Sequence, residues 1–264
     1  MKKLNEFADS VAVVVSSCDA FFDCWQPFAA FFRKFWPGCP FPVHLIVNQL
    51  PIRSSYIRAM AVGEDRNWAS NMKTALTQIN AKRVLYLQED YFLTAPVDEE
   101  RLARDFAYAF ENDVDAFCFR ARSELESSFT PVNDDFGVVP PGSDGRTRCQ
   151  LTLWRRDAFV SVLRDGETAW EMESRGSERT REMKILSYST RDRAPVPYLM
   201  SAIVRGLWTP EAIELCKRHG VQINPRFRAT YSRRPLLQRA GRVWTRVGLR
   251  RALQAHANAP IELE

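Results

Sequence analysis

Two adjacent carboxylates that directly follow an apolar segment are the residues best suited to chemistry. Glu89 and Asp90 come after the run at 83–87, whose composition is that of a buried strand, and Gln88 stands between the run and the pair. Mg²⁺ and Mn²⁺ prefer hard oxygen ligands and usually bind a substrate phosphate as well. The pair therefore indicates a divalent-cation site at the end of this strand. A solvated acidic turn is the alternative interpretation.

A second acidic segment places two glutamates beside a tryptophan. Trp170, Glu171 and Glu173 lie in a polar stretch at 165–182. A carboxylate can take a proton from a hydroxyl during group transfer, and the apolar face of a sugar packs on an aromatic ring. The alternative is a surface helix, in which acids two residues apart face different sides and share no function.

Strands and helices alternate over the first 95 residues, and this alternation positions the acidic pair. Apolar, β-branched runs at 11–15, 43–47 and 83–87 predict strands. Apolar residues at helical spacing predict helices at 26–36 and 68–79. Such alternation implies right-handed crossovers between parallel strands. We therefore expect an α/β fold with a mostly parallel central sheet and helices on both faces.

Polar side chains follow each of these predicted strands. In parallel sheets of this kind, ligands bind beyond the carboxyl ends of the strands. Residues that are far apart in sequence should therefore converge on one cleft. They are Ser16, Ser17, Asp19, Asn48, Gln88, Glu89 and Asp90.

The later part of the chain predicts further elements around this sheet. Their patterns are weaker, except for a helix that opens with Thr209 and Pro210 and closes at Gly220. The others are a helix at 102–110, a strand at 114–120, a loop at 130–146, a strand at 149–154 and a short helix capped by Asp157.

Residue usage excludes several classes of function. The six cysteines and three histidines are scattered without metal-ligand spacing, so neither a zinc site nor a redox dithiol is expected. No apolar run reaches the roughly 18–20 residues needed to span a bilayer. The first ten residues lack a signal-peptide core and cleavage site, which favours a cytoplasmic protein.

The net charge of +5 belongs entirely to the end of the chain. Residues 1–230 contain 30 Lys and Arg against 30 Asp and Glu, whereas 231–264 contain seven arginines against Glu262 and Glu264. A neutral body with a basic tail favours one localised anionic partner and argues against a general nucleic-acid-binding surface. We therefore divide the chain into a domain at 1–230 and a basic tail at 231–264.

The basic tail has the pattern of an amphipathic helix over 235–251. At 100° per residue, its apolar residues fall within an arc of roughly 120°, and four arginines lie on the adjacent flank. This pattern suits a helix in the interface of an anionic membrane. The alternative is packing on the protein's own body or on a second subunit. The apolar set is Leu236, Leu237, Ala240, Val243, Trp244 and Val247, and the arginines are Arg239, Arg242, Arg246 and Arg250.

The order and spacing of several short motifs resemble bacterial GT-A-type glycosyltransferases of surface-polysaccharide (lipopolysaccharide or capsule) assembly. The resemblance covers roughly residues 10–230. It rests on the motifs Ser16-Ser-Cys-Asp19, Gly63-Glu-Asp-Arg-Asn-Trp68, Gln88-Glu-Asp-Tyr91, Gln150-x-x-Leu-Trp154, Trp170-Glu-Met-Glu173 and Val204-Arg-Gly-Leu-Trp208.

This resemblance implies roles for the residues after the third strand. Asp90 matches the last aspartate of the family's Asp-x-Asp motif, which holds the Mg²⁺ or Mn²⁺ that bridges the donor diphosphate. Gln88 replaces the first aspartate; it can hydrogen-bond a ribose hydroxyl but is a poor Mg²⁺ ligand. Neutralisation of the diphosphate without metal, by arginines such as Arg205, is therefore the alternative.

The resemblance also implies donor-binding and acceptor-binding groups. Glu173, with Glu171 as second choice, is the expected base that deprotonates the acceptor hydroxyl. The donor-binding candidates are Ser17, Asp19, Asp65, Gln88, Glu89 and Arg205, and the candidate aromatic platforms for the acceptor are Trp154, Trp170 and Trp208.

The sequence thus predicts a cytoplasmic enzyme, peripheral on the inner face of the membrane. It would transfer a sugar, with inversion, from a nucleotide-sugar donor to a surface-glycan acceptor that is lipid-linked. A sugar-1-phosphate nucleotidyltransferase is the alternative enzyme, but Ser16-Ser-Cys-Asp19 lacks the glycine-rich basic loop of that class. A non-catalytic protein that binds nucleic acid or another anion is the third reading, and the neutral body argues against it.

Overall fold

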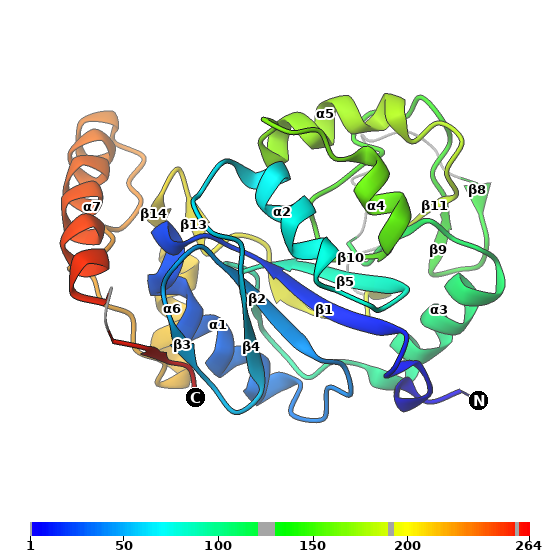
Figure 1. Cartoon of the computed structure of the whole chain (residues 1–264), viewed down its shortest axis with the longest axis horizontal. Coiled ribbons are helices and arrows are strands. Elements are labelled where there is room, and N and C mark those ends of the chain that lie inside the picture. The colour runs from blue at the N-terminus through cyan, green and yellow to red at the C-terminus, as the bar shows by residue number, and fades with distance from the viewer. Residues whose placement is uncertain (1, 121–129, 190–192, 257–258) are drawn as a thin grey trace.

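The computed structural model describes residues 2–120, 130–189, 193–256 and 259–264, and its centre is a mixed sheet covered by helices (Figure 1). In the described residues the sheet has nine strands. Their order is β4 (Ile57–Ala61), β2 (Val43–Val47), β1 (Val11–Ser16), β5 (Arg83–Gln88), β10 (Thr152–Arg155), β7 (Ala116–Cys118), β11 (Ile185–Tyr188), β9 (Phe136–Val138) and β8 (Thr130–Pro131).

The four strands at one side of the sheet are parallel, so their carboxyl ends share one edge. The register sets Ser16 of β1 opposite Gln88 of β5, and β2 pairs with both β1 and β4 in the same direction. β10 then runs antiparallel to β5 and β7, while β11 is parallel to β7. The predicted α/β class is confirmed, with parallel strands on the side that carries the predicted cleft and mixed pairing beyond it.

Side chains alternate across β1 and bury two separate cores. Val11, Val13 and Val15 pack into one core, and Ala12 and Val14 into the other. This explains why the strand is continuously apolar: both of its faces are covered. On the first face lie α1 (Phe22–Phe35), α3 (Glu99–Glu111) and α6 (Pro210–His219), and on the second α2 (Trp68–Thr77), α4 (Arg156–Val162) and α5 (Ala169–Arg179).

Side-chain caps fix where several helices begin. Asn67, Asp98 and Thr209 each accept a hydrogen bond from a backbone N–H in the first turn of α2, α3 and α6. The predicted ends of α6 are confirmed, since Gly220 closes it with a left-handed φ of 69°.

Some predicted boundaries are wrong because tertiary packing overrides local signals. α1 begins at Phe22 with Pro27 inside it, since burial of Cys24 and Trp25 extends the helix towards its N-terminus. The predicted loop at 130–146 contains β8 and β9: β9 pairs with β11, and β8 pairs with β9 at the edge of the sheet. Asp157 lies in the first turn of α4 and does not cap it.

Smaller elements complete the described chain. None of its helices is long and apolar enough to cross a membrane. The last helix packs on the body, and the strand after it pairs with β3, so both elements are held against the rest of the molecule. These elements are η1 (Leu4–Phe7), η2 (Asp19–Phe21), β3 (Ile52–Arg53), β6 (Phe92–Leu93), β12 (Tyr198–Leu199), β13 (Ile203–Val204), β14 (Leu207–Trp208), α7 (Pro235–His256) and β15 (Ile261–Glu262).

Candidate active site

A cavity of about 270 Å³ opens beyond the carboxyl ends of β1 and β5. It gathers side chains from the strand ends, from the loop before α2 and from the start of α5. Four of the predicted donor-binding residues, Ser17, Asp65, Gln88 and Glu89, line it. The other lining residues are Ser16, Cys18, Phe21, Ile46, Asn67, Trp68, Asn71, Met72 and Ala169.

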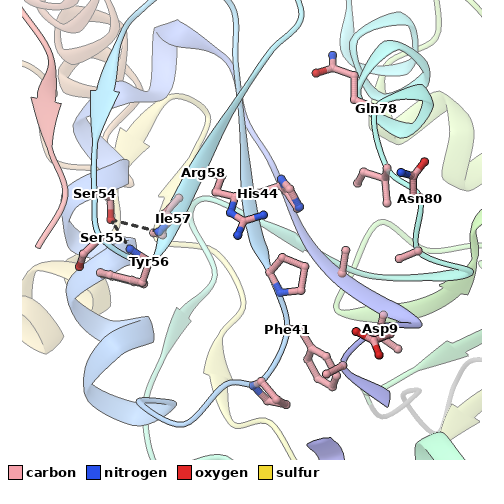
Figure 2. Close-up of a pocket in the computed structure, with 17 residues that line it drawn as sticks. Asp9, Phe41, His44, Ser54, Ser55, Tyr56, Ile57, Arg58, Gln78 and Asn80 are labelled. Atoms are coloured by element: carbon pink, nitrogen blue, oxygen red, sulfur yellow. Dashed lines mark hydrogen bonds between the residues drawn. The ribbon is translucent and has the colours of Figure 1, made fainter. Parts of the chain in front are cut away.

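A larger cavity of about 750 Å³ lies at the opposite end of the same strands (Figure 2). His44 and Arg58, which are paired across β2 and β4, point into it, and burial followed by the nearby Arg58 charge lowers the pKa of His44. None of the predicted site residues lines this cavity. Since ligands of such sheets bind at the carboxyl ends of the strands, the smaller cavity is the candidate active site.

Hydrogen bonds fix the wall of the candidate site that is formed by α2. The Trp68 indole donates to the Ser16 hydroxyl at 3.0 Å, and the Asn71 side-chain amide donates to the Asp65 carboxylate at 2.7 Å. Asp65 is thereby held at the cavity. Asn71 also lines the cavity and is part of the site.

Asp19 has a structural role instead of the predicted donor contact. Its carboxylate accepts three backbone hydrogen bonds, from Asn48, Gln49 and Leu50, at 2.8–3.0 Å. The Asn48 side chain accepts the Asp19 N–H in return. Asp19 does not line the cavity, so it acts by joining the ends of β1 and β2.

Glu89 and Asp90 are both buried, but their side chains have different neighbours. Glu89 lines the cavity, whereas Asp90 accepts a hydrogen bond from the Ile203 N–H at 3.2 Å through Oδ2. Burial raises the pKa of Asp90 to about 7, and burial together with the Asp90 charge raises the pKa of Glu89. The same burial, with Glu89 and Asp65 nearby, raises the pKa of Cys18 to about 12, so this cysteine is a neutral thiol.

The acidic pair fits a divalent cation only in part. Asp90 Oδ1 is buried and has no hydrogen-bond partner in the described part of the chain, which is the environment of a carboxylate oxygen that awaits a ligand. No group of three or more Asp, Glu, His or Cys side chains able to hold a metal ion occurs among the described residues. Phosphate oxygens and water would therefore have to supply most of the coordination sphere, as is common for Mg²⁺.

The peptide group of Cys149 joins Glu173 to the end of β5. Its N–H donates to the Glu173 carboxylate at 2.6 Å, while its carbonyl accepts from the Gln88 amide at 2.9 Å and the Tyr91 hydroxyl at 2.8 Å. Burial raises the pKa of Glu173, and this effect is opposed by the Cys149 N–H and the Arg148 charge. Glu173 is thus a half-buried carboxylate beside the candidate site.

Glu171, the second candidate base, is a helix cap. Its carboxylate accepts hydrogen bonds from the N–H and the hydroxyl of Thr168, and the Thr168 hydroxyl accepts the Glu171 N–H in return. These bonds, followed by the Arg175 charge, lower the pKa of Glu171. A carboxylate held in this capping box is a poor proton acceptor, which corrects the prediction.

Two of the three predicted aromatic platforms are core residues. Trp154 and Trp208 are each 1% exposed, so neither ring face is available to a sugar, and their prediction as acceptor contacts is wrong. Trp170 is 81% exposed in the first turn of α5, next to the cavity-lining Ala169. Of the three, it is the one that can contact an acceptor.

The buried cation near the acidic pair is Arg228, and the predicted Arg205 lies elsewhere. Arg205 is exposed in the turn between β13 and β14 and donates to Gln238 of α7. Arg228 forms a buried, bidentate ion pair with Asp23 and also donates to the carbonyls of Ala20 and Gly206. Its charge opposes the rise that burial causes in the pKa of both Glu89 and Asp90. The sequence gives no signal for Arg228, because its ion-pair partner Asp23 lies 205 residues away.

The comparisons with known proteins find similar folds and no family. No protein-family model matches the chain, and no curated protein matches it. A structure of S. aureus TarS 1–349 is similar over 72% of this chain and 59% of its own, with 11% identity and a TM-score of 0.47. The chain therefore spans about three fifths of that structure.

Two further structures show the range of these likenesses. A CMP:2-keto-3-deoxy-manno-octonic acid synthetase in complex with CTP aligns over 81% of this chain and 99% of its own, with 9% identity and a TM-score of 0.44. Drosophila β-1,4-galactosyltransferase 7, in complex with manganese, UDP-Gal and xylobiose, aligns over 73% and 71%, with 11% identity and a TM-score of 0.39. All three TM-scores lie below 0.5, so the function is argued from the site itself.

Proposed function

We propose that the protein is an inverting glycosyltransferase that uses a nucleotide-sugar donor. The observation that carries this proposal is the Cys149 peptide, which ties the carboxylate of Glu173 to the strand end that holds Gln88 and Glu89. One cavity edge thereby presents polar groups for a donor and, beside them, a carboxylate suited to proton transfer.

The donor would occupy the cavity at the ends of β1 and β5. Ser17, Asp65 and Gln88 offer hydrogen-bonding groups for the base and ribose. Asp90, with Glu89 beside it, would hold Mg²⁺ or Mn²⁺ against the diphosphate, and the bound cation would stabilise the charge of the leaving group. None of the described residues that line the cavity is basic, so neutralisation by arginine contact inside this cavity is not supported.

Glu173 would act as the general base. As the acceptor hydroxyl oxygen forms a bond to the anomeric carbon, the Glu173 carboxylate takes the hydroxyl proton. The bond from the anomeric carbon to the diphosphate breaks on the opposite face, and the nucleoside diphosphate leaves with that electron pair. Burial raises the pKa of Glu173, which improves its capacity to accept this proton.

The acceptor would be a bacterial surface glycan that carries a lipid, and it would be bound at the inner face of the membrane. Trp170 is the exposed aromatic residue beside the site and would supply a platform for one sugar ring.

Substitution Trp170→Ala will raise the KM for the glycan acceptor about 2- to 10-fold, because stacking on an aromatic ring contributes about 0.5–1.5 kcal/mol. The variant will keep the melting temperature of the parent, since Trp170 is 81% exposed. Steady-state kinetics with varied acceptor measures the effect. Trp244→Ala, at an exposed position on α7, is the control that should leave the KM for a soluble acceptor unchanged. An unchanged KM for Trp170→Ala would remove the platform role.

Donor binding tests the proposed function most directly. We expect one of the UDP-, GDP-, CMP- or dTDP-sugars to raise the melting temperature in a concentration-dependent way, more strongly with Mn²⁺ present. Asp65→Ala should weaken that donor, whereas Glu178→Ala, an exposed position on α5, should not. Release of pyrophosphate from a nucleoside triphosphate and a sugar 1-phosphate would identify a nucleotidyltransferase. Binding of duplex DNA, with no change of melting temperature in any nucleotide sugar, would instead indicate a non-catalytic anion-binding protein.

A further inference from the structure

α7 carries three distinct faces along its 22 residues. One face packs on the body, the next presents a row of arginines, and the third is apolar and exposed. The helix lies at the left edge of the molecule in Figure 1, where its outer surface meets no other described element.

The packing face of α7 combines two polar and two apolar residues. Gln238, Thr245, Leu249 and Ala252 are buried, and the Thr245 hydroxyl accepts a hydrogen bond from the Ala229 N–H at 2.9 Å. A Cβ at Gly248 would overlap with the carbonyl oxygen of Arg226. This close approach explains a glycine that otherwise weakens the helix, and it shows that α7 is folded against the body through this face.

The apolar face is directed away from the body. Leu236 is 83% exposed, and Trp244 and Val243 are about 60% exposed. Leu237 and Val247 complete the set at 54% and 45%. Five large apolar side chains on one free helix face exceed what a soluble surface normally exposes as a contiguous patch. The alternative that this apolar stripe packs on the protein's own body is therefore contradicted for the described residues.

An apolar groove of about 480 Å³ deepens this face. Phe227, Trp244, Val247 and Gly248 line it, so the groove lies between α7 and the segment at 226–227. Arg226 and Arg251 also line the groove. An apolar groove with two arginines in its lining matches a lipid, whose acyl chain is apolar and whose phosphate is anionic.

We propose that this face of α7 is a binding surface for an anionic phospholipid bilayer, with the groove taking one acyl chain of an anionic lipid. Leu236, Val243 and Trp244 insert into the interface between headgroups and chains. The arginine row at 239, 242, 246 and 250 lies beside the phosphates, and Arg226 and Arg251 contact the headgroup of the lipid in the groove. This goes beyond the proposed sugar transfer and does not depend on it.

The positive charge of residues 231–264 favours an anionic bilayer over a second copy of the chain as the partner of this face. Residues 231–264 hold seven arginines and two glutamates, whereas the rest of the chain is neutral. A second copy on this face would bring two arginine rows into one contact with no matching acidic surface, which costs free energy. An anionic membrane supplies both the apolar phase and the opposite charge.

Vesicle co-sedimentation of the full chain tests the proposal. Truncation is unsuitable, because α7 covers part of the core. We expect binding to vesicles that contain phosphatidylglycerol, weak binding to pure phosphatidylcholine, and loss of binding as salt rises. Arg242→Gln with Arg246→Gln should lower binding about 25-fold, since each arginine near the surface contributes about fivefold. Arg175→Gln on α5 with Arg181→Gln just after its end, both exposed, removes the same charge elsewhere and should leave binding nearly unchanged.

The apolar contact has its own readout. Phosphatidylglycerol with brominated acyl chains should quench Trp244 fluorescence, and Trp244→Phe should bind equally well but lose that quenching. Trp244→Glu with Val247→Glu should abolish binding while the melting temperature stays unchanged, because both side chains are exposed. Equal binding of this glutamate variant, equal binding to neutral vesicles, or self-association of the chain through α7 without vesicle binding would each overturn the proposal. Donor binding is unaffected by any of these outcomes.

Discussion

Substitution Glu173→Gln will lower turnover by about 10²–10⁴-fold, the usual contribution of a general base. Glutamine keeps the oxygen that accepts the Cys149 N–H at 2.6 Å, so the local structure and the affinity for the donor should be preserved. The amide cannot take the proton of the attacking hydroxyl. Turnover measured at saturating donor and acceptor, together with a donor titration, separates these two effects.

Glu171→Gln is the matched control, because it makes the same chemical change two residues away. Glutamine can still serve in the capping box with Thr168, so turnover should stay within about twofold. The pH profile adds a second check. Because burial raises the pKa of Glu173, the parent should lose activity as pH falls through that pKa, while Glu173→Gln should lack this acidic limb. A strong loss in Glu171→Gln, or none in Glu173→Gln, would contradict the assignment.

The convergence of the strand ends could be predicted from the sequence because it follows from parallel topology. A parallel register sets Ser16 beside Gln88, and that register brings Ser17 and Glu89 to the same cavity. Asp65 and Asn71 follow because α2 begins at this edge. These residues need only correct strand directions to be placed, and strand direction is encoded in the alternation of elements.

The roles of other residues could not be read from the sequence, since they depend on contacts between distant segments. The Cys149 peptide carries no side-chain signature, although it connects Glu173 with Gln88. Arg228 is one of many arginines, and only the fold pairs it with Asp23. Trp154 and Trp170 were both candidate aromatic platforms, yet one is buried and the other exposed.

The secondary-structure elements also divide into those that local sequence predicts and those that it does not. Strongly apolar β1 and β5 and the capped helix α6 were predictable from local pattern and end signals. The short strands β8 and β9 contain two and three residues and gain their stability from pairing, β9 with β11 and β8 with β9. Strands of this length have no reliable local pattern, because side-chain packing across strands supplies most of their preference.

Substitution Asp90→Asn will have opposite effects on activity and stability. If Asp90 binds the cation that neutralises the donor diphosphate, the amide should lower activity about 100-fold or more, because Lewis-acid stabilisation contributes several kcal/mol. Asparagine can still accept the Ile203 N–H, so the fold should be kept. Activity of the parent should fall in EDTA and recover with Mn²⁺, whereas the variant should respond to neither. Full activity in EDTA together with a normal Asp90→Asn variant would remove the metal role.

The stability of the same variant follows from the buried charge. Asp90 has a pKa of about 7 in the folded protein against an ordinary value of 3.8, so the folded state binds its proton more tightly than the unfolded chain does. Stability of the parent should therefore decrease as pH rises from about 4 to about 7, and this part of the decrease should be absent in Asp90→Asn. Thermal unfolding measured from about pH 4 to above pH 7 gives the difference in stability between the parent and the variant. This difference should be largest above pH 7.

Asp105→Asn provides the control that separates burial from function. Asp105 is also buried, and burial raises its pKa to about 7, but it accepts a hydrogen bond from Tyr188 in the core and does not line the candidate site. Each variant should lose the part of the pH dependence of stability that its own carboxylate contributes, and only Asp90→Asn should lose activity. A buried carboxyl group that lowers stability when it ionises is expected where that charge is needed for a ligand. If Asp90→Asn is neither more stable than the parent above pH 7 nor less active, Asp90 is an ordinary buried residue, and the donor site must be held together by other groups.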